Sequence, residues 1–261
     1  MGFHFMNGAW RWAGARAIGT SHLKSDTPCQ DYACAKMFLT QDGPVMAAVV
    51  SDGAGSASLA ELGSRTVCIS FLKACRDFLS RSTLDNLDEE VVEDWVDAIR
   101  EAINQKAKAA EARPRDFAAT LVALLVAGER SVVIHVGDGA AVIRREGCDD
   151  WEVPSWPYQG EYASTTSFVT DDPQPRLEVI SIEGRVAEFA VFSDGIERMV
   201  LDHVSKTPHG PFFDRMLAPL KSSVAETVDK ALSLALRDYL DSANVCERTD
   251  DDKSLILGLR T

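Results

Sequence analysis

Residues 45–53 read VMAAVVSDG, an uninterrupted apolar run that ends at Asp52. A run of this length is typical of a buried strand, so the sequence places a carboxylate where a strand ends. The pattern recurs at residues 132–139, VVIHVGDG, and at residues 188–195, EFAVFSDG. A charge at the end of a buried strand is costly unless a cation lies beside it, and the three runs therefore predict a shared site.

Two further segments place aspartates next to apolar runs. Gln30-Asp31 precedes the run at 32–39, and residues 250–254, DDDKS, precede the last run of the chain. Carboxylates that converge on one partly dry spot repel one another, and hard divalent cations relieve that repulsion. Mg²⁺ and Mn²⁺ prefer oxygen ligands. The five segments together predict a metal site assembled from strand ends.

The composition is that of a globular protein. The chain has 261 residues, 46% hydrophobic and 26% charged, which suits one large domain over residues 1–261. The net charge of −13 argues against a nucleic-acid-binding surface or an anionic membrane patch. A phosphate-bearing substrate would need bound cations to invert the local field.

The location that the sequence predicts is the cytoplasm. No basic and apolar leader opens the chain, and no apolar run approaches about 18 residues, the length that spans a membrane. The six cysteines form no Cys-x-x-Cys pair, which favours small buried thiols in a reducing compartment. Cys29 lacks the Cys-x₅-Arg pattern of a tyrosine phosphatase nucleophile.

Hydrophobic periodicity predicts clusters of strands and helices rather than βαβ alternation. This grouping favours an α+β fold with mostly antiparallel sheets. Asp42-Gly43 is a hairpin signal between the second and third strands. The expected strands cover residues 10–19, 32–39, 45–50, 117–126, 131–136, 177–182, 188–192 and 254–259, and the expected helices cover residues 59–79, 88–112 and 224–240.

Residues 148–176 form a long connection without periodicity. Trp151, Trp156, Tyr158 and Tyr162 lie there among proline, glycine and serine. Long connections in compact domains are often functional. Two interpretations are open: a surface that faces a protein partner, or a loop that folds down on the core.

Each Asp motif alone has a simpler explanation. Ser51-Asp52-Gly53 and Ser193-Asp194-Gly195 could be turns, and Gly137-Asp138-Gly139 is expected to be a hairpin between residues 132–136 and 140–144. The ordered set, with Thr120 between the first and second Asp-Gly motifs, resembles the metal-dependent protein phosphatase family of type 2C, the PPM group. The resemblance extends from about Gly14 to Leu259, and it is greatest for the divergent bacterial branch whose first motif ends in Cys-Gln-Asp, as in residues 29–31.

The resemblance implies a fold and an activity. The fold would be a sandwich of two antiparallel β-sheets flanked by helix layers, α-β-β-α, with the metal site at one end and a flap-like insertion at about 148–176. The activity would be hydrolysis of phosphoserine and phosphothreonine in proteins, by attack of a hydroxide that bridges two Mn²⁺ or Mg²⁺ ions. A third, looser ion, a phosphoprotein substrate and an opposing serine/threonine kinase are also implied.

Four positions match the family's ligands for the two ions. Asp52 matches the carboxylate that bridges them, and the Gly53 carbonyl matches a ligand of one ion. Asp194 and Asp251 match ligands of the other ion. Asp52 and Asp194 would therefore be catalytic through the metals that they position.

The remaining positions are matched less directly. Asp31 matches an acidic residue, catalytic in the family, that holds water on a metal, and Asp138 matches a ligand of the third ion, which Asp194 helps to hold. Thr120 matches a structural position. Gln30 stands where family members usually have glutamate, so the site has one negative charge fewer.

The family's phosphate-binding arginine is missing from the first motif. His22 falls nearest that place, and it could bind the substrate phosphate when protonated or could cap the loop. Ala54 replaces a histidine that acts as a general acid in many eukaryotic members. These departures sustain a rival hypothesis, a catalytically silent module that binds phosphoproteins as a scaffold, whereas the complete set of Asp52, Asp194 and Asp251 favours the enzyme.

Overall fold

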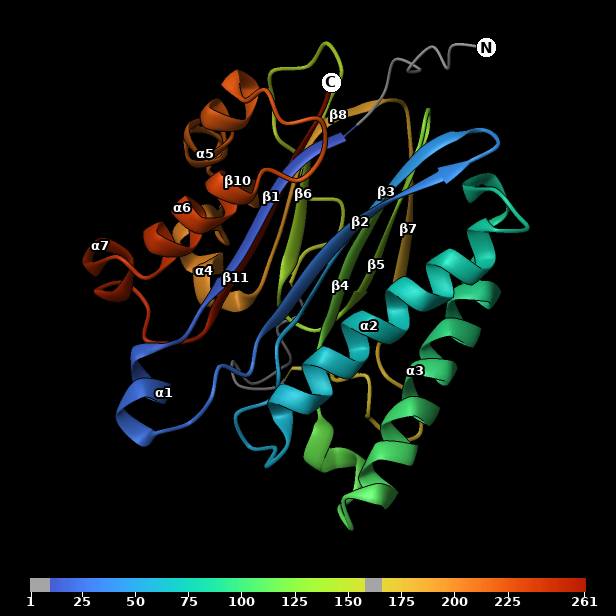
Figure 1. Ribbon diagram of the computed structural model, residues 1–261, viewed down its shortest axis with the longest axis vertical. Helices are drawn as coiled ribbons and strands as arrows, with labels where there is room; N and C mark the ends of the chain where they lie inside the picture. The colour runs from blue at the N-terminus through green and yellow to red at the C-terminus, as the bar shows by residue number, and fades with distance from the viewer. Residues whose placement is uncertain (1–9, 158–165) are drawn as a thin grey trace.

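The computed structural model describes residues 10–157 and 166–261, and these form two antiparallel sheets packed face to face (Figure 1). One sheet has four strands in the order β1-β11-β8-β6, and the other has five in the order β2-β3-β4-β5-β7. The first sheet comprises β1 (Trp10–Ala17), β6 (Ala140–Arg145), β8 (Val186–Phe192) and β11 (Lys253–Arg260). The second comprises β2 (Tyr32–Thr40), β3 (Gly43–Ser51), β4 (Leu121–Val126), β5 (Arg130–Val136) and β7 (Glu178–Glu183).

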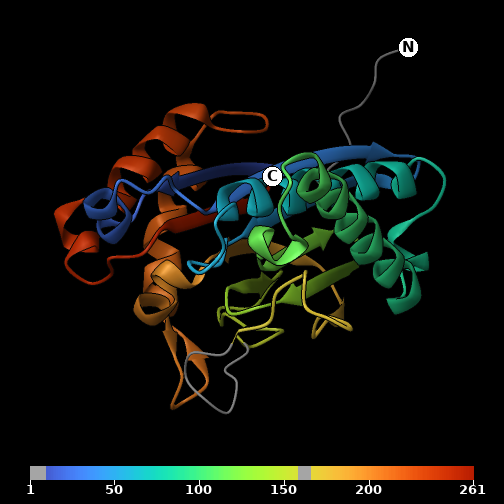
Figure 2. The same cartoon turned by 90° about the horizontal axis from the view of Figure 1, so that it is seen from below.

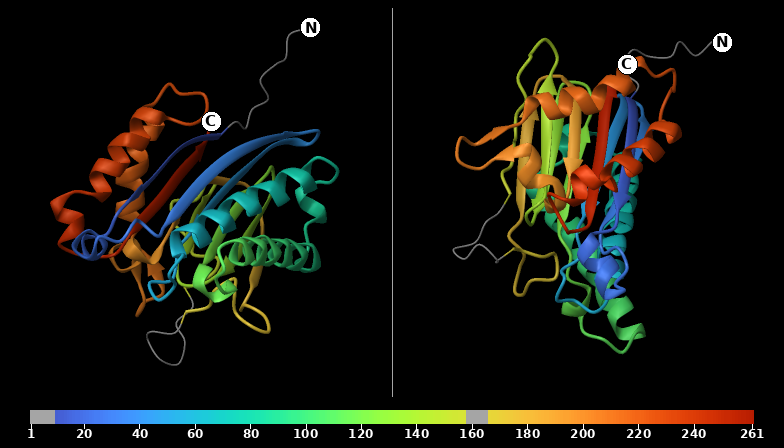
Figure 3. Two further views of the ribbon diagram at one scale, coloured as in Figure 1. Left: turned by 60° about the horizontal axis from the view of Figure 1, so that its bottom comes forward. Right: turned by 90° about the vertical axis from the view of Figure 1, so that its left-hand side faces the viewer.

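Helices cover the outer face of each sheet. Figure 3, left, shows α2 and α3 on one side of the sandwich and α5 and α6 on the other, which confirms the predicted α-β-β-α layers. The helices are α1 (Thr20–Ser25), α2 (Ala60–Leu79), α3 (Glu89–Ala109), α4 (Asp194–Val200), α5 (Gly210–Ser222), α6 (Lys230–Leu240) and α7 (Ala243–Cys246). Two short 3₁₀ helices, η1 (Leu84–Asn86) and η2 (Pro114–Phe117), and a small hairpin, β9 (Leu201–Asp202) with β10 (Thr207–Pro208), complete the described elements.

The central strands are apolar throughout because both of their faces are buried. In β3, Val45, Ala47 and Val49 pack under α2 and α3, whereas Met46 and Ala48 point into the space between the sheets. Successive side chains of a strand face opposite sides, so a strand between two cores shows no polar alternation. The same holds for β4, and this explains why the runs that carry the Asp motifs read as solid apolar blocks.

Gly137–Gly139 is not a hairpin, and that prediction was wrong. Strand β5 belongs to the five-stranded sheet and β6 to the four-stranded one, so this segment carries the chain from one sheet to the other. Gly137 has φ +122°, and a Cβ there would lie 2.6 Å from the Thr120 side chain. Glycine is the residue that tolerates both constraints, and the crossing places Asp138 between the sheets' ends.

The helix predicted at 224–240 begins only at Lys230. Asp229 caps it, since the Asp229 Oδ1 accepts a hydrogen bond from the Leu232 amide at 2.9 Å. The Asp229 amide donates to the Trp12 carbonyl at 2.8 Å, so the residues just before the helix lie along the edge of β1. Val224 is 95% exposed; its helical spacing was coincidental. Periodicity also missed α1, α4 and α5.

Two further boundaries differ from the prediction. The strand expected at 117–126 begins at Leu121 because Pro114 starts a 3₁₀ turn that includes Phe117. In the aromatic connection, Trp151 is buried and packs on Phe213, with ring centroids 5.1 Å apart. The start of the connection therefore folds on the core.

Tyr158 and Tyr162 lie outside the described residues. Within residues 10–157 and 166–261, no helix has the length and apolar character needed to cross a bilayer.

Candidate metal centre at one end of the sandwich

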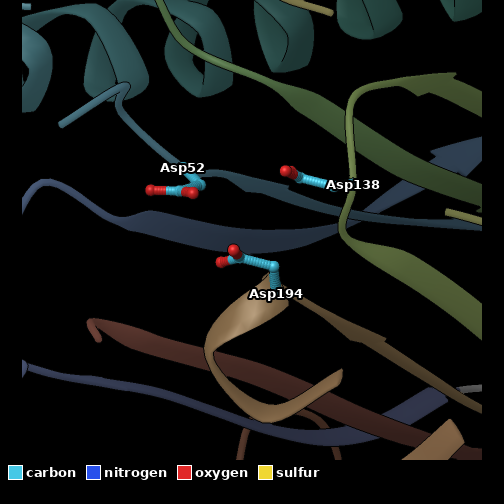
Figure 4. A group of neighbouring side chains, drawn as sticks. All are labelled: Asp52, Asp138 and Asp194. Carbon is cyan, nitrogen blue, oxygen red and sulfur yellow. The ribbon is translucent and has the colours of Figure 1, made fainter. Parts of the chain in front are cut away.

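Three carboxylates from separate elements meet at one end of the sandwich. Asp52 follows β3, Asp138 lies on the crossing between β5 and β6, and Asp194 begins α4 (Figure 4). One carboxylate oxygen of each lies within 4.8 Å of the others. The sequence motifs at these three positions, separated by 142 residues from first to last, are therefore brought together as one group.

Asp52 is fixed by Thr120. The Asp52 amide donates to the Thr120 Oγ1 at 2.9 Å, and the Thr120 amide donates to the Asp52 carbonyl at 2.8 Å. The Ser51 hydroxyl donates to the Thr120 carbonyl at 2.5 Å. These bonds hold the end of β3 against the start of β4, and they leave the Asp52 carboxylate to face Asp138 and Asp194.

Asp194 is placed by a close approach that requires glycine. A Cβ on Gly195 would lie 1.8 Å from the Asp252 carbonyl oxygen, so a larger residue would push α4 away from the segment before β11. Asp138 is held in place by Thr166, whose hydroxyl donates a hydrogen bond to the Asp138 Oδ2.

Asp31 lies fully buried behind the group. The Ser193 hydroxyl donates to the Asp31 Oδ2 at 2.7 Å, and the same Ser193 oxygen accepts the Ser254 amide at 2.9 Å. Ser193 therefore connects the first motif, the Asp194 motif and the last strand. The sequence analysis did not predict this role of Ser193, although Ser193 directly precedes Asp194 in the Ser-Asp-Gly motif.

Asp251 and Asp252 have different surroundings. Asp251 is exposed, and its Oδ1 accepts the Asp252 amide at 2.8 Å. Asp252 is buried, and it accepts hydrogen bonds from the Gly19 amide at 2.6 Å and the Gln30 amide at 2.5 Å. Asp251 lies outside the group whose oxygens are within 4.8 Å of one another among the described residues.

His22 is attached to Asp252 rather than to the three carboxylates. Its Nδ1 lies 2.9 Å from the Asp252 Oδ2, and its side chain is partly exposed on α1. From the sequence, two roles were open for His22, a phosphate ligand or a loop cap. The observed contact connects the loop to the start of β11, and it occupies one of the two ring nitrogens, Nδ1.

Burial and neighbouring carboxylates raise the pKa values of Asp31, Asp52, Asp138, Asp194 and Asp251. Burial, then the charges of Asp138 and Asp251, raise the pKa of Asp194 to about 8. Burial raises the pKa of Asp31 to about 6, and burial followed by the neighbouring carboxylates raises that of Asp52 well above its ordinary range. Two carboxylates about 5 Å apart repel by roughly 3 kcal/mol at an effective dielectric constant of 20. The protein alone does not neutralise this repulsion.

The donor set fits hard divalent cations. Buried oxygens of Asp31, Asp138 and Asp194, the Oδ1 atom in each case, have no hydrogen-bond partner within the described residues. Buried polar atoms are nearly always satisfied, so these unpartnered carboxylate oxygens fit a role as ligands of a divalent cation. No nitrogen or sulfur atom belongs to the group, which favours Mg²⁺ or Mn²⁺ over zinc.

Sequence reasoning missed one acid near this group. Glu197 lies one turn after Asp194 on α4 and is buried, and its Oε1 lies 2.6 Å from the His203 Nε2. Burial, then the charge of Asp138, raises the pKa of Glu197 to about 7. The spacing of three residues on a helix was the available signal.

The surroundings of Cys29 and His135 favour structural roles for both side chains. Burial, then the charges of Asp252 and Asp31, raises the pKa of the Cys29 thiol, which disfavours the nucleophilic thiolate. His135 is buried, and its Nδ1 lies 2.6 Å from the Ser155 hydroxyl. Cys148, by contrast, is exposed, so the expectation of buried thiols holds only for some of the cysteines.

Known proteins share the sequence pattern and the fold. The family model described as protein phosphatase 2C matches residues 18–238. Serine/threonine-protein phosphatase 3 of Escherichia coli strain K12 is 35% identical over 254 residues, which cover 96% of this chain and 98% of that protein.

Two solved structures show the same fold at lower identity. The catalytic domain of the serine/threonine protein phosphatase PstP, solved in complex with two manganese ions, superposes with a TM-score of 0.63 at 18% identity, covering 97% of this chain and 98% of that one. PppA, described as a key regulatory component of T6SS in Pseudomonas aeruginosa, superposes with a TM-score of 0.66 at 15% identity, covering 98% and 99%.

Proposed function

We propose, from the premise that this chain belongs to the protein phosphatase 2C family, that it is a divalent-metal-dependent protein serine/threonine phosphatase. The observation that carries the proposal is the convergence of Asp52, Asp138 and Asp194, with carboxylate oxygens within 4.8 Å of one another and raised pKa values. Such a group is electrostatically unfavourable unless cations occupy it, and bound cations would also attract the dianionic phosphate of a substrate.

The proposed metal ligands are those that the family resemblance implies, and the observed group of Asp52, Asp138 and Asp194 supports part of them. Asp52 would contribute to the sites of two Mn²⁺ or Mg²⁺ ions, with the Gly53 carbonyl as a ligand of one ion and Asp194 with Asp251, which lies outside that group, as ligands of the other. When bound, the ions would supply Lewis acidity, which acidifies water and offsets charge on the phosphoryl oxygens. Asp138 and Asp194 would together hold a third ion more loosely.

The protein's own groups orient the reaction. Asp31, held by Ser193, accepts a proton or a hydrogen bond from water at the site. Its pKa near 6 leaves its carboxylate mostly ionised at neutral pH and therefore able to accept. Thr120 keeps Asp52 in place through the amide bond at 2.9 Å.

His22 is the proposed phosphate-binding residue in place of the family's arginine. Its Nδ1 is engaged by Asp252, which fixes the ring and leaves Nε2 as the nitrogen that would meet a phosphate oxygen. A single donor is weaker than a bidentate arginine, so we expect a higher KM for substrate rather than a lost reaction.

The substrates would be phosphoproteins, and the enzyme would oppose a serine/threonine kinase in the cytoplasm. The test is phosphate release from phosphothreonine, phosphoserine and phosphotyrosine peptides with Mn²⁺, compared with excess chelator. We expect turnover of the first two peptides and of a small aryl phosphate, lost in chelator, and a loss of at least about a hundredfold in Asp52→Asn. Metal binding without turnover of any peptide would instead favour the scaffold hypothesis.

A further inference from the structure

A basic cavity of about 340 Å³ lies beside η2, at the same end of the molecule as the metal centre. Figure 2 views the molecule from this end, with η2 in green and the connection after residue 166 in yellow. The lining side chains come from α3, from η2 and its preceding residue, and from that connection: Arg100, Asn104, Arg113, Arg115, Thr170 and Asp172.

Arg100 carries a positive charge that forms no ion pair with a carboxylate of residues 10–157 or 166–261. Its Nη1 donates to the Asp171 carbonyl at 2.8 Å and its Nη2 to the Pro173 carbonyl at 3.2 Å. Carbonyl oxygens are neutral acceptors, so the guanidinium keeps its full positive charge while its position is fixed. Arg100 therefore holds the connection at residues 171–173 in place and gives the cavity a positive charge.

Arg115 is the arginine available to a ligand. Arg113 is paired with Asp116 at 3.1 Å, whereas Arg115 is exposed and its guanidinium makes no hydrogen bond or ion pair within the described residues. Asp172 is the acidic residue in the lining. Because Asp116 offsets Arg113, Arg100 and Arg115 against Asp172 leave the cavity positive in a chain whose net charge is −13. A guanidinium with free donors binds carboxylate or phosphate in a bidentate manner.

One wall of the cavity runs directly to the bridging aspartate. The Ala118 carbonyl accepts the Ala54 amide at 2.9 Å, and Thr120 exchanges hydrogen bonds with Asp52. Arg115 and Thr120 are five residues apart, so their Cα atoms are separated by at most about 18 Å. An extended peptide bound at the metal centre would cover that distance in at most about five residues.

The other wall reaches a second member of the metal centre. Thr166 donates to Asp138, the Val169 amide donates to the Ala119 carbonyl at 2.9 Å, and Thr170 lines the cavity. The cavity and the metal centre are therefore built on shared backbone segments.

We propose that this cavity is a substrate subsite for an anionic side chain, an aspartate, a glutamate or a second phosphoresidue, within about five residues of the phosphoserine or phosphothreonine that is hydrolysed. The inference rests on the proposed phosphatase function and adds a sequence preference to it. Elsewhere the acidic surface of the chain repels such substrates, so a basic subsite would select their orientation.

The test compares two phosphothreonine peptides. One carries glutamates about two to five residues away on either side of the phosphothreonine, and the other carries glutamines there. We expect wild-type protein to prefer the glutamate peptide, and Arg115→Glu to lower kcat/KM for that peptide by about three- to tenfold while sparing the glutamine peptide and a small aryl phosphate. Lys73→Glu, the same charge change on the exposed far half of α2, is the matched control.

A binding measurement separates this inference from the proposed function. Fluorescence anisotropy of the labelled glutamate phosphopeptide in excess chelator should show weaker binding to Arg115→Glu than to wild type or Lys73→Glu. If no peptide is hydrolysed under any condition but this difference persists, the phosphatase proposal fails and the anionic subsite stands. Equal binding and equal turnover of both peptides by wild type and Arg115→Glu would overturn the subsite, as would an equal effect of Lys73→Glu.

Discussion

Asp194→Asn should stabilise the metal-free protein at alkaline pH. The pKa of Asp194 rises from 3.8 to about 8 on folding, chiefly because of burial and then of the charges of Asp138 and Asp251. An acid whose pKa is raised in the folded state costs stability once it is ionised. The cost is absent below about pH 4, grows as the pH rises, and is complete above about pH 8.

The size of the effect follows from that shift. At 1.36 kcal/mol per pKa unit, the full gap corresponds to at most about 6 kcal/mol. The neighbouring carboxylates share this cost, since protonation of one relieves the others, so we expect removal of one charge to gain about 2 kcal/mol. For a chain of this size, that gain would raise Tm by roughly 4–8 °C at pH 8 and by much less at pH 5.

Thermal unfolding followed by circular dichroism in excess chelator, at pH 5 and pH 8, measures this directly. Asp42→Asn, in the exposed β2–β3 turn, removes the same charge far from the group and is the control. With Mn²⁺ present the order should reverse, because wild type gains binding energy that Asp194→Asn loses. An Asp194→Asn protein no more stable than wild type at pH 8 in chelator would refute the repulsion argument.

Three further substitutions separate structural from functional roles. Thr120→Val removes the acceptor of the Asp52 amide and should cost about 1–2 kcal/mol in urea unfolding together with turnover, whereas Thr120→Ser keeps the hydroxyl and should lose little. His22→Ala should raise KM for a phosphopeptide several-fold with a smaller change in kcat; an unchanged KM would leave His22 only its contact with Asp252. Trp156→Ala, whose partly exposed ring lies near His203 and Lys206, should weaken turnover of a phosphoprotein but not of an aryl phosphate, whereas Trp151→Ala, which removes a buried ring, should cost about 3–5 kcal/mol of stability.

The sandwich was predictable because its strands carry their own signal. Residues 45–50 and 121–126 are apolar on both faces, and each of these strands ends at or begins beside a motif residue. The order of the motifs along the chain was therefore enough to predict that Asp52, Asp138 and Asp194 lie in one group. What local patterns could not specify was the crossing at Gly137. The same glycine-rich sequence suits a hairpin and a crossing to the second sheet. The two are distinguished only by the pairing of β6 with β8.

The contacts that support the site were not predictable for a different reason. The Asp252 carboxylate accepts a hydrogen bond from the Gln30 backbone amide, 222 residues away in the sequence. The Ser193 hydroxyl donates one to Asp31, 162 residues away. Such hydrogen bonds form only because the fold brings distant backbone segments close together, and the residue types alone do not predict which segments meet. The start of α6 was misplaced because the Asp229 backbone pairs with β1, a tertiary contact that overrides helical spacing.

The central claim is that carboxylates at one end of the sandwich hold divalent cations that hydrolysis requires. Equilibrium binding of Mn²⁺ to chelator-stripped protein, measured by calorimetry alongside phosphate release from a phosphothreonine peptide, tests it most directly. Wild type should bind at least two ions per chain, with turnover rising as they bind, and Asp52→Asn should lose both ions together because one carboxylate bridges them. Full Mn²⁺ binding by Asp52→Asn, or undiminished turnover by the stripped wild type, would contradict the account.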